Sequence, residues 1–236
     1  MPDTPLIPDA EPASAPPAPR AAWLAMAAAG LLALALLGLW VVDGAPLGWD
    51  RTIMLALRVP GDPRQPIGPE WLHYAMIDVT ALGGGFVLTL AVIVVTGLLL
   101  VRRLWLTAAL VLAATISGSI LAGQAKFFFH RTRPTLVDHL IDVTGLSFPS
   151  GHATNSAIVY LTLAGLIAQV ERGHRTRAYT MAVATLLVGA IGISRVYLGV
   201  HWPSDVLAGW CAGTAWAALW WWLGASARAS LARRRQ

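Results

Sequence analysis

Long apolar runs separated by short polar segments make up most of the chain. A helix needs ~20 apolar residues to cross the ~30 Å hydrocarbon core of a membrane, and these runs approach or exceed that length. Six membrane-spanning helices are predicted, at residues 21–42, 75–101, 105–123, 152–170, 178–193 and 205–225. The pattern therefore predicts an all-α integral membrane protein with a single six-span domain at residues 21–225.

The two ends of the chain depart from this pattern. Residues 2–20 are rich in Pro and Ala and show no apolar periodicity, so residues 1–20 are predicted to form a disordered tail. Residues 226–236 form a short basic tail. The first apolar run is too long for a signal peptide, and no clear small-residue cleavage site follows it. We therefore expect this run to remain in place as a membrane anchor.

Composition agrees with a membrane protein, and charge predicts its orientation. Hydrophobic residues make up 56% of the chain and charged residues 12%, against about a quarter charged in soluble proteins. Arginines lie in the loops after the second and fourth spans and in the basic tail, namely Arg102, Arg103, Arg172, Arg175, Arg177, Arg228, Arg233, Arg234 and Arg235. The positive-inside rule then predicts that both termini are cytoplasmic and that loops 43–74, 124–151 and 194–204 face outward. The net charge of +5 reflects this topology, so no nucleic-acid partner is expected.

The sequence offers no ligand set for a metal or a disulfide. Cys211 is the only cysteine and lies within the sixth predicted span, so neither an intramolecular disulfide nor a thiolate cluster can form. His, Asp and Glu residues also lack the spacing of a zinc site. We therefore expect no metal and no other cofactor.

The first candidate motif is the stretch KFFFHRTRP in an outward loop. Lys126 and Arg133 are seven residues apart, which on a helix would place both cations on one face. Such a pair suits a multiply charged anion, although two cations extending to the membrane interface would look the same. Lys126 is also the only lysine among 17 Lys and Arg residues. His130 and Arg131, between them, are expected to add positive potential or to face lipid headgroups.

The second motif, FPSGH, runs into the fourth predicted span. Ser150 and Gly151 would form the turn before the helix, with His152 in its first turn. Unpaired N–H groups at a helix start attract anions, and Gly151 would let a ligand approach the backbone. The alternative is an ordinary helix capped by Ser150, with an interfacial histidine.

The third motif, ISRVYLGVHWPSD, places charged residues around the start of the sixth span. Asp205 lies in the first helical turn, from which its carboxylate can reach back to His201. A carboxylate bonded to one imidazole nitrogen leaves the other free to act as a nucleophile. Arg195 offers a planar fork for phosphate-type oxygens. Each residue alone could be a helix-end residue, but together they predict an anion site on one membrane face.

Taken together, the three motifs resemble the signature of the type 2 phosphatidic acid phosphatase family. These lipid phosphate phosphatases are related to bacterial acid phosphatases and vanadium haloperoxidases. The segments that carry the resemblance are Lys126-x6-Arg133-Pro134, Pro149-Ser150-Gly151-His152 and Ser194-Arg195-x5-His201-x3-Asp205. All three motifs are complete and in the expected order, and the six-span layout also resembles the membrane branch of the family.

The resemblance implies a role for each residue. His201 would attack phosphorus and form a phosphohistidine, Asp205 would orient it, and His152 would protonate the leaving group. The phosphoryl oxygens would be held by Lys126, Arg133, Ser150, Gly151 and Arg195. The resemblance further implies that no metal is needed, because fixed cations take the place of the magnesium used by other phosphoryl-transfer enzymes.

The expected function is dephosphorylation of a lipid phosphate or diphosphate, such as a polyprenyl diphosphate, phosphatidylglycerophosphate or phosphatidic acid. We expect the active site at the extracytoplasmic interface of a bacterial inner (plasma) membrane, where the substrate headgroup rests. A phosphatase for a soluble ester is the alternative. A haloperoxidase is disfavoured by the six spans, and a lipid or phosphate transporter is disfavoured because its charges usually lie near the bilayer midplane. The Gly209-x3-Gly213 spacing allows close helix packing without indicating the number of subunits.

Overall fold

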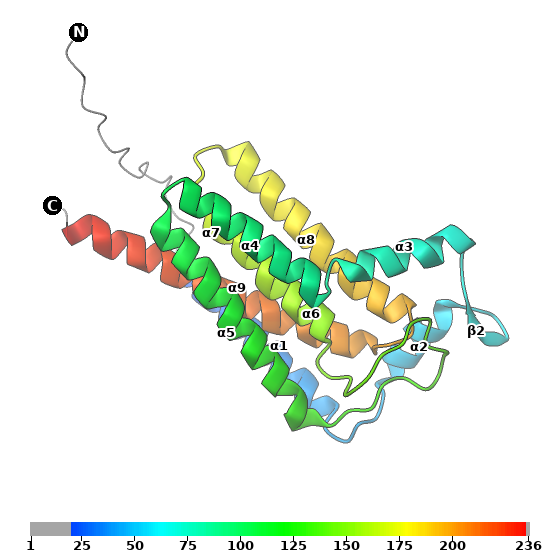
Figure 1. Cartoon of the computed structure of the whole chain (residues 1–236). Coiled ribbons are helices and arrows are strands. Elements are labelled where there is room, and N and C mark those ends of the chain that lie inside the picture. Colours follow the sequence, from blue (N-terminus) through cyan, green and yellow to red (C-terminus); the bar gives the residue numbers. More distant parts are fainter. Residues whose placement is uncertain (1–19, 235–236) are drawn as a thin grey trace, which may run out of the picture.

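The computed structural model describes residues 20–234, without the side chain of Phe127 (Figure 1). The tail predicted at residues 1–20 thus lies outside the described residues, except for Arg20, which begins the first helix. The elements are α1 (Arg20–Trp40), α2 (Gly48–Ala56), β1 (Arg58–Val59), β2 (Asp62–Pro66), α3 (Glu70–Ala81), α4 (Gly85–Val101), α5 (Trp105–Phe129), α6 (Gly151–Ser156), the π-helical turn η1 (Ala157–Leu161), α7 (Thr162–Ala168), α8 (His174–Tyr197) and α9 (Pro203–Arg234).

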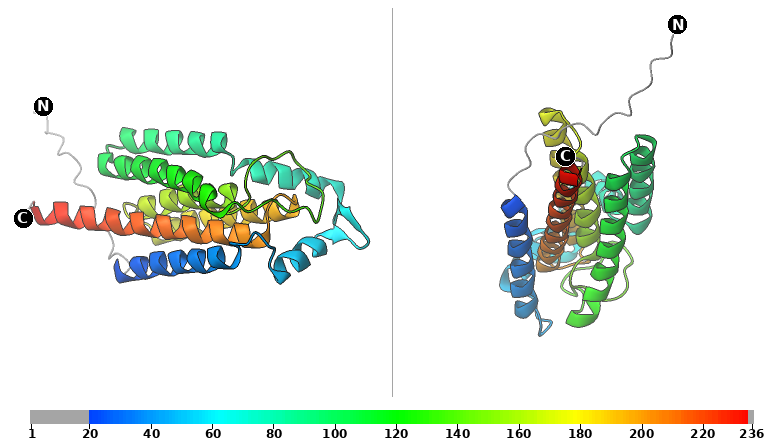
Figure 2. Two further views of the ribbon diagram at one scale, coloured as in Figure 1. Left: turned by 90° about the horizontal axis from the view of Figure 1, so that it is seen from below. Right: turned by 90° about the vertical axis from the view of Figure 1, so that its left-hand side faces the viewer.

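The long helices lie side by side in one elongated bundle (Figures 1 and 2). Helix α1 packs along α9, α4 packs on α5, and the segment from α6 to α7 packs against α5, α8 and α9. Helix α2, the β1–β2 hairpin and α3 gather at one end of the bundle, and the start of α1 and the end of α9 lie at the other (Figure 2). The bundle therefore has two distinct ends, of which one is built up by additional elements.

Three helices among the described residues are long and apolar enough to cross a membrane. They are α1, α8 and residues Trp105–Lys126 of α5, and the bent pair of α3 and α4 adds a fourth if it is counted as one span. The segment from α6 to α7 is divided by η1. The prediction of a helical membrane protein is confirmed, although the chain also forms the small β1–β2 hairpin, whereas the full set of six crossings stays a prediction.

The second predicted span is wrong as a single helix over residues 75–101. Helix α3 begins earlier, at Glu70, and meets α4 at a bend of 52°. The break coincides with consecutive glycines, which weaken a helix. At Gly83 a Cβ would lie 2.5 Å from Ile191 Cγ2, so the packing there requires a glycine. The Tyr160 hydroxyl donates to the Leu82 carbonyl in the break at 2.8 Å, which satisfies a backbone group that the bend would leave free.

Helix α9 is the central element of the bundle and is longer than predicted. It continues through Arg234, so most of the tail predicted at residues 226–236 is helical. A Cβ at Gly209 would lie 2.9 Å from Ala153 Cβ, and one at Gly213 would lie 2.7 Å from the Thr154 carbonyl. The Gly209-x3-Gly213 spacing therefore serves contact between α9 and the segment from α6 to η1 within this chain.

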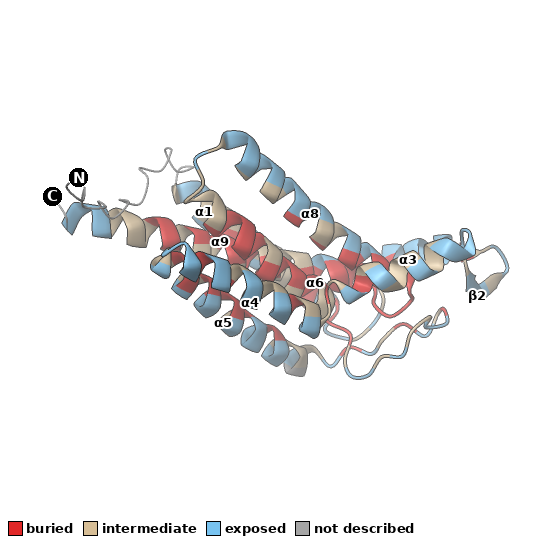
Figure 3. Ribbon diagram, turned by 45° about the horizontal axis from the view of Figure 1, so that its top comes forward, coloured by how far each residue is buried: buried red, intermediate tan, exposed pale blue. Residues whose placement is uncertain are grey.

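Buried and exposed residues follow the faces of the helices. Apolar side chains on the outer faces of α4, α5 and α8 are exposed, as at Leu186, which is 72% exposed (Figure 3). Exposed apolar faces of this extent are typical of helices surrounded by lipid. Polar residues that are fully buried concentrate instead where α9 begins, and they include Arg131, His201 and Asp205. This end of the bundle therefore differs from the rest in its buried polar residues.

The segment between α1 and α4 is ordered against that end. Buried Arg58, in β1, donates to the carbonyls of Leu57 at 3.1 Å and Tyr197 at 3.0 Å. Tyr197 is the last residue of α8, where a cation is favourable because helix carbonyls there lack partners. Arg58 therefore fixes α2 and the hairpin to the end of α8, close to Arg195.

Candidate active site

The eight predicted site residues gather at the end of the bundle where α9 begins. They come from the end of α5, the loop at residues 130–150, the start of α6, the end of α8, the loop at residues 198–202 and the start of α9. Lys126 lies within electrostatic reach of Arg133, Arg195 and Asp205. His152 is likewise within reach of Arg195 and His201. Residues separated by up to 79 positions in the sequence therefore share one charged site.

His201 and Asp205 form the predicted pair. His201 Nδ1 lies 3.4 Å from Asp205 Oδ2, and both side chains are almost completely buried. The Trp202 N–H donates to the same carboxylate oxygen at 2.9 Å, and the Ser147 hydroxyl also donates to it. These bonds hold the carboxylate against Nδ1 and leave Nε2 on the opposite side of the ring. His201 Nε2 faces Arg133 Nη1 at 3.2 Å.

The surroundings of His201 favour its neutral form. Burial lowers the pKa of His201 from 6.5 to about 4; the Asp205 carboxylate opposes this effect, and Arg133 and Arg195 add to it. A neutral imidazole is the form that can act as a nucleophile. His201 is therefore neutral across the neutral pH range, as a nucleophilic imidazole must be.

Arg133 reaches the site by a different route from the one predicted. It does not share a helical face with Lys126, because α5 ends at Phe129 and His130 adopts a left-handed conformation with φ of 45°. Pro134 disfavours a helical conformation for the residue before it, which explains why the helix stops short of Arg133. The guanidinium donates to the carbonyls of Thr144 at 2.9 Å, Gly145 at 3.1 Å and Val200 at 2.8 Å. Arg133 therefore joins the loop at residues 130–150 to the nucleophilic side of His201.

Two buried polar atoms of the predicted site residues have no hydrogen-bond partner among the described residues. They are Ser150 Oγ and Arg195 Nε. Ser150 occupies the N-cap position of α6, but its hydroxyl makes no capping hydrogen bond, which argues against the simple capping interpretation of FPSGH. Arg195 is fixed by donation from Nη1 to Thr80 Oγ1 at 3.0 Å. Buried polar groups are rarely left unpaired, so these two suit a ligand that brings hydrogen-bonding oxygens.

The remaining predicted residues line the same pocket. Lys126 Nζ would lie 3.4 Å from a Cβ built at Gly151, so the lysine tip passes close over this glycine. A Cβ at Gly83 would lie 3.3 Å from His152 Cδ2, which places the break between α3 and α4 beside this histidine. His152 is only half-buried. It can therefore be reached by a substrate.

Sequence reasoning missed four buried residues that support the site: Asp50, Thr80, Arg131 and Ser147. Arg131 was expected to add potential or to face headgroups, but it is fully buried and its Nη1 lies 2.6 Å from Asp205 Oδ1. The only signal in the sequence is its place two residues before Arg133. Asp50 and Thr80 lie far from the three motifs along the chain, and no local pattern could have identified them.

The charged side chains around His201 and His152 are mainly cations and do not form an acidic cluster. Within residues 20–234, no three His, Cys, Asp or Glu residues gather so that they could hold a metal ion. Lys126, Arg133 and Arg195 instead place three positive charges around His201 and His152. Together with unpaired donors, such an arrangement suits a phosphate group and the charge that develops on it during transfer.

Comparison with known proteins agrees with this chemistry. Phosphatidylglycerophosphatase B of Bacillus subtilis (strain 168) is 35% identical over 152 residues, which are 64% of this chain and 72% of that protein. Decaprenylphosphoryl-5-phosphoribose phosphatase of Mycobacterium tuberculosis (strain ATCC 25618 / H37Rv) is 32% identical over 111 residues, which are 46% of this chain and about half (54%) of that protein.

The fold is similar to that of a solved relative. A crystal structure of a transmembrane PAP2-type phosphatidylglycerolphosphate phosphatase from Bacillus subtilis matches with a TM-score of 0.70 and 29% identity, covering 82% of this chain and 93% of that one. The PAP2 superfamily model matches residues 103–228, a segment that contains all eight predicted site residues. The chain therefore belongs to the PAP2 superfamily and is a multi-pass membrane phosphatase of that family.

Proposed function

We propose that this protein removes phosphate from a membrane lipid phosphate or diphosphate, without a metal ion, by forming a phosphohistidine at His201. One observation supports this reaction above the others. A buried His–Asp pair lies among three cations, beside the unpaired donors Ser150 Oγ and Arg195 Nε. A phosphoryl group would satisfy both donors and lie beside the nucleophilic nitrogen.

The reaction proceeds in two displacements. His201 Nε2 attacks phosphorus and forms a P–N bond while the bond to the leaving oxygen breaks, and His152 gives that oxygen a proton. His201 Nδ1–H stays bonded to Asp205, whose carboxylate stabilises the positive charge on the phosphorylated ring. A water molecule then attacks phosphorus, neutral His152 takes its proton, and the P–N bond breaks. Inorganic phosphate leaves and neutral His201 is restored.

The cations stabilise the phosphoryl group through both displacements. Arg133 already points Nη1 at His201 Nε2, at 3.2 Å, so it can donate to a phosphoryl oxygen during attack. Lys126 and Arg195 add charge, and Ser150 and the Gly151 N–H add donors. Fixed groups of this kind act most strongly on charge that develops in the transition state.

The substrate class follows from the membrane setting and from the relatives. By their names, the two relatives compared above act on phosphatidylglycerophosphate and on a decaprenyl-linked phosphate. A lipid substrate can keep its chains in hydrocarbon while its phosphate enters the pocket. Shielding these chains from water favours the lipid over a soluble ester by ~0.8 kcal/mol for each CH₂ buried.

Phosphate release from purified protein tests this function. We expect long-chain lipid phosphates or diphosphates to be cleaved far faster than glucose 6-phosphate, and cleavage to continue in excess EDTA. His201→Ala should abolish release, whereas His174→Ala, at the exposed start of α8, should not. Equal efficiency on lipid and soluble esters would favour the soluble-ester alternative. Loss of activity in EDTA, restored by magnesium, would refute the metal-free reaction.

The six-span topology and the outward-facing site are also part of the proposal. Their support is the arginine pattern, together with six helical segments that overlap the six predicted spans. On a Cys211→Ser background, a cysteine at exposed Thr135 should react with an impermeant thiol reagent in intact cells. A cysteine at Thr176, exposed at the opposite end, should not react. The reverse labelling pattern would place the site in the cytoplasm.

A further inference from the structure

A fully buried cluster of charges lies behind the His–Asp pair. Its members are Asp50 on α2, Arg131 in the loop after α5, and Ser204 and Asp205 in the first turn of α9. Each of the four residues is 0% exposed. Burying charges in this way is costly unless they are closely paired, so the cluster needs an explanation beyond surface charge.

Arg131 lies between two carboxylates. Its Nη1 is 2.6 Å from Asp205 Oδ1 and its Nη2 is 3.0 Å from Asp50 Oδ2. The other Asp205 oxygen, Oδ2, faces His201. The two oxygens of Asp205 therefore have different partners, and rotating the carboxylate would break both contacts.

Asp50 in turn binds the start of α9. Its Oδ1 accepts the Ser204 N–H at 2.8 Å and its Oδ2 accepts the Ser204 hydroxyl at 2.7 Å. The Ser204 hydroxyl oxygen also accepts from Arg131 Nη1 at 2.8 Å. Asp50 thus satisfies a backbone N–H at the start of α9 from a separate helix, and it fixes the residue next to Asp205.

The charge balance of the cluster matters for the reaction. With Arg131 alone, the guanidinium would neutralise Asp205 and weaken its attraction for a charged imidazole ring. Asp50 supplies a second negative charge, so two carboxylates and one guanidinium leave a net charge of −1 beside His201. That charge is what the phosphorylated, positively charged ring requires.

We infer that Asp50 and Arg131 are positioning residues for phosphoryl transfer: they orient Asp205 toward His201 and preserve its negative charge. This inference rests on the proposed phosphohistidine reaction. Asp50 lies outside residues 103–228, the segment that the superfamily model matches, so α2 adds this function to the site from a separate part of the chain.

The test compares Asp50→Asn, Arg131→Gln and the double variant on a lipid phosphate. Arg131→Gln should lower kcat by about 100-fold with little change in KM, because Asp50 and Asp205 then face each other without a cation. Asp50→Asn should lower kcat by about tenfold. The double variant should recover about tenfold over Arg131→Gln, because removing one carboxylate relieves the unpaired charge.

Controls separate this effect from loss of folding. Asp43→Asn removes a carboxylate and Arg64→Gln removes a guanidinium, and both groups are exposed in the segment between α1 and α3. These variants should leave kcat unchanged. Each rate is divided by the folded fraction from thermal unfolding in detergent. If Arg131→Gln does not fold, Arg131→Lys and Asp50→Asn carry the test, and Arg131→Lys should stay within about tenfold of the wild type.

The outcomes distinguish two failures. An inactive wild type, or a fully active His201→Ala, would overturn the proposed function itself. An active wild type with inactive His201→Ala, but with unchanged kcat in Asp50→Asn, would overturn only the positioning role. A double variant slower than Arg131→Gln would also overturn it, because relief of the unpaired carboxylate requires a recovery of kcat.

Discussion

Replacing Arg195 by lysine removes the Nε donor and the planar guanidinium from the site while keeping a positive charge. Arg195 Nη1 is engaged by Thr80 Oγ1 at 3.0 Å, and Nε has no partner among the described residues. Nε is therefore a buried donor that a phosphoryl oxygen would pair. Lysine has no counterpart to Nε in that position, and its single ammonium cannot bond Thr80 and the phosphoryl group in the same geometry.

The expected loss can be worked out from that single bond. A hydrogen bond to a charged group contributes ~1.5–3 kcal/mol. Since 1.36 kcal/mol corresponds to tenfold in rate, Arg195→Lys should lower kcat/KM by about 10- to 150-fold. Most of the loss should fall on kcat, because charge on the phosphoryl oxygens grows in the transition state.

Steady-state phosphate release from a lipid phosphate in detergent measures this effect. Arg175→Lys, at the exposed start of the same helix, is the matched control and should behave as the wild type. Thr80→Val removes the partner of Nη1 without touching the cation, and it should give a smaller loss through a less well-fixed guanidinium. Unchanged kcat/KM in Arg195→Lys would refute the assignment of Nε to the phosphoryl group.

Three further predictions concern the nucleophile, its partner and the packing of α9. Because the pKa of His201 is lowered to about 4, the acid limb of kcat/KM should lie near pH 4 instead of near 6.5. The same shift means that the unfolded state binds more protons than the folded state between these two pH values. The unfolding temperature should therefore fall as the pH falls through that range. Asp205→Asn should lower kcat by at least about 1,000-fold. It should also lower the unfolding temperature, since it breaks the buried contact with Arg131. An unchanged unfolding temperature would contradict that contact. Gly213→Val should destabilise the protein by ~1–3 kcal/mol or more, because its side chain would meet Ala157 and the Thr154 carbonyl. Gly189→Val is the control and should be tolerated in the same unfolding assay, because a Cβ there meets nothing within 4 Å.

The sequence predicted the motifs and their common location better than it predicted their geometry. Apolar runs identified six helical segments, and the motif spacing placed His201 next to Asp205. The interpretation of Lys126 and Arg133 as one helical face was wrong, because it extended a helix through a residue that precedes a proline. The single span at residues 75–101 was wrong for a related reason, since hydropathy averages over the glycines at which the helix bends.

The supporting residues of the site could not be predicted, because their contacts connect distant parts of the chain. Asp50 and Arg131 are 81 positions apart, and Thr80 and Arg195 are 115 apart. Apart from its nearness to Arg133, no local signal distinguishes Arg131, which is fully buried, from the arginines that face the interface. Only the packing of α2 and α3 against the end of the bundle decides which of these charges become part of the site.

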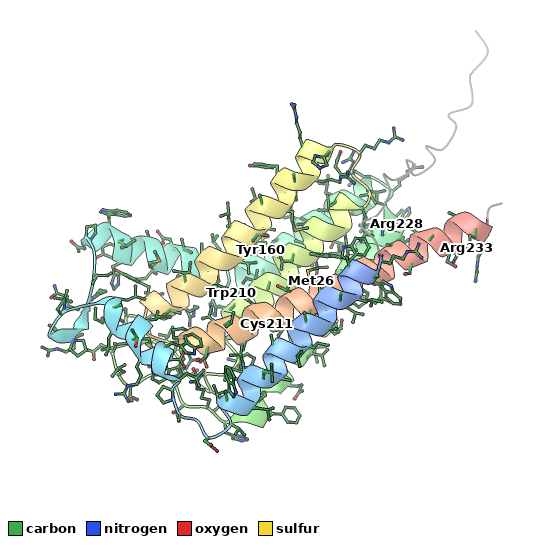
Figure 4. The ribbon with its side chains drawn as sticks, turned by 180° about the vertical axis from the view of Figure 1, so that it is seen from behind. Met26, Tyr160, Trp210, Cys211, Arg228 and Arg233 are labelled. Carbon is green, nitrogen blue, oxygen red and sulfur yellow. The ribbon has the colours of Figure 1, made fainter. Side chains whose placement is uncertain are left out.

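Helix α9 also joins the candidate active site to the opposite end of the bundle through one continuous helix. It runs without a break from Asp205 past Arg228, over about 35 Å. Arg228 bonds Gln169 at 2.7 Å and Thr107 at 2.9 Å near the opposite end of the bundle (Figure 4). Under the proposed topology, a change in bilayer thickness cannot be matched by shortening this helix. It is matched by tilting of the bundle or by deformation of the surrounding lipid, and both change the position of the site relative to the lipid headgroups. Under that topology, turnover in vesicles should therefore pass through an optimum as acyl-chain length increases.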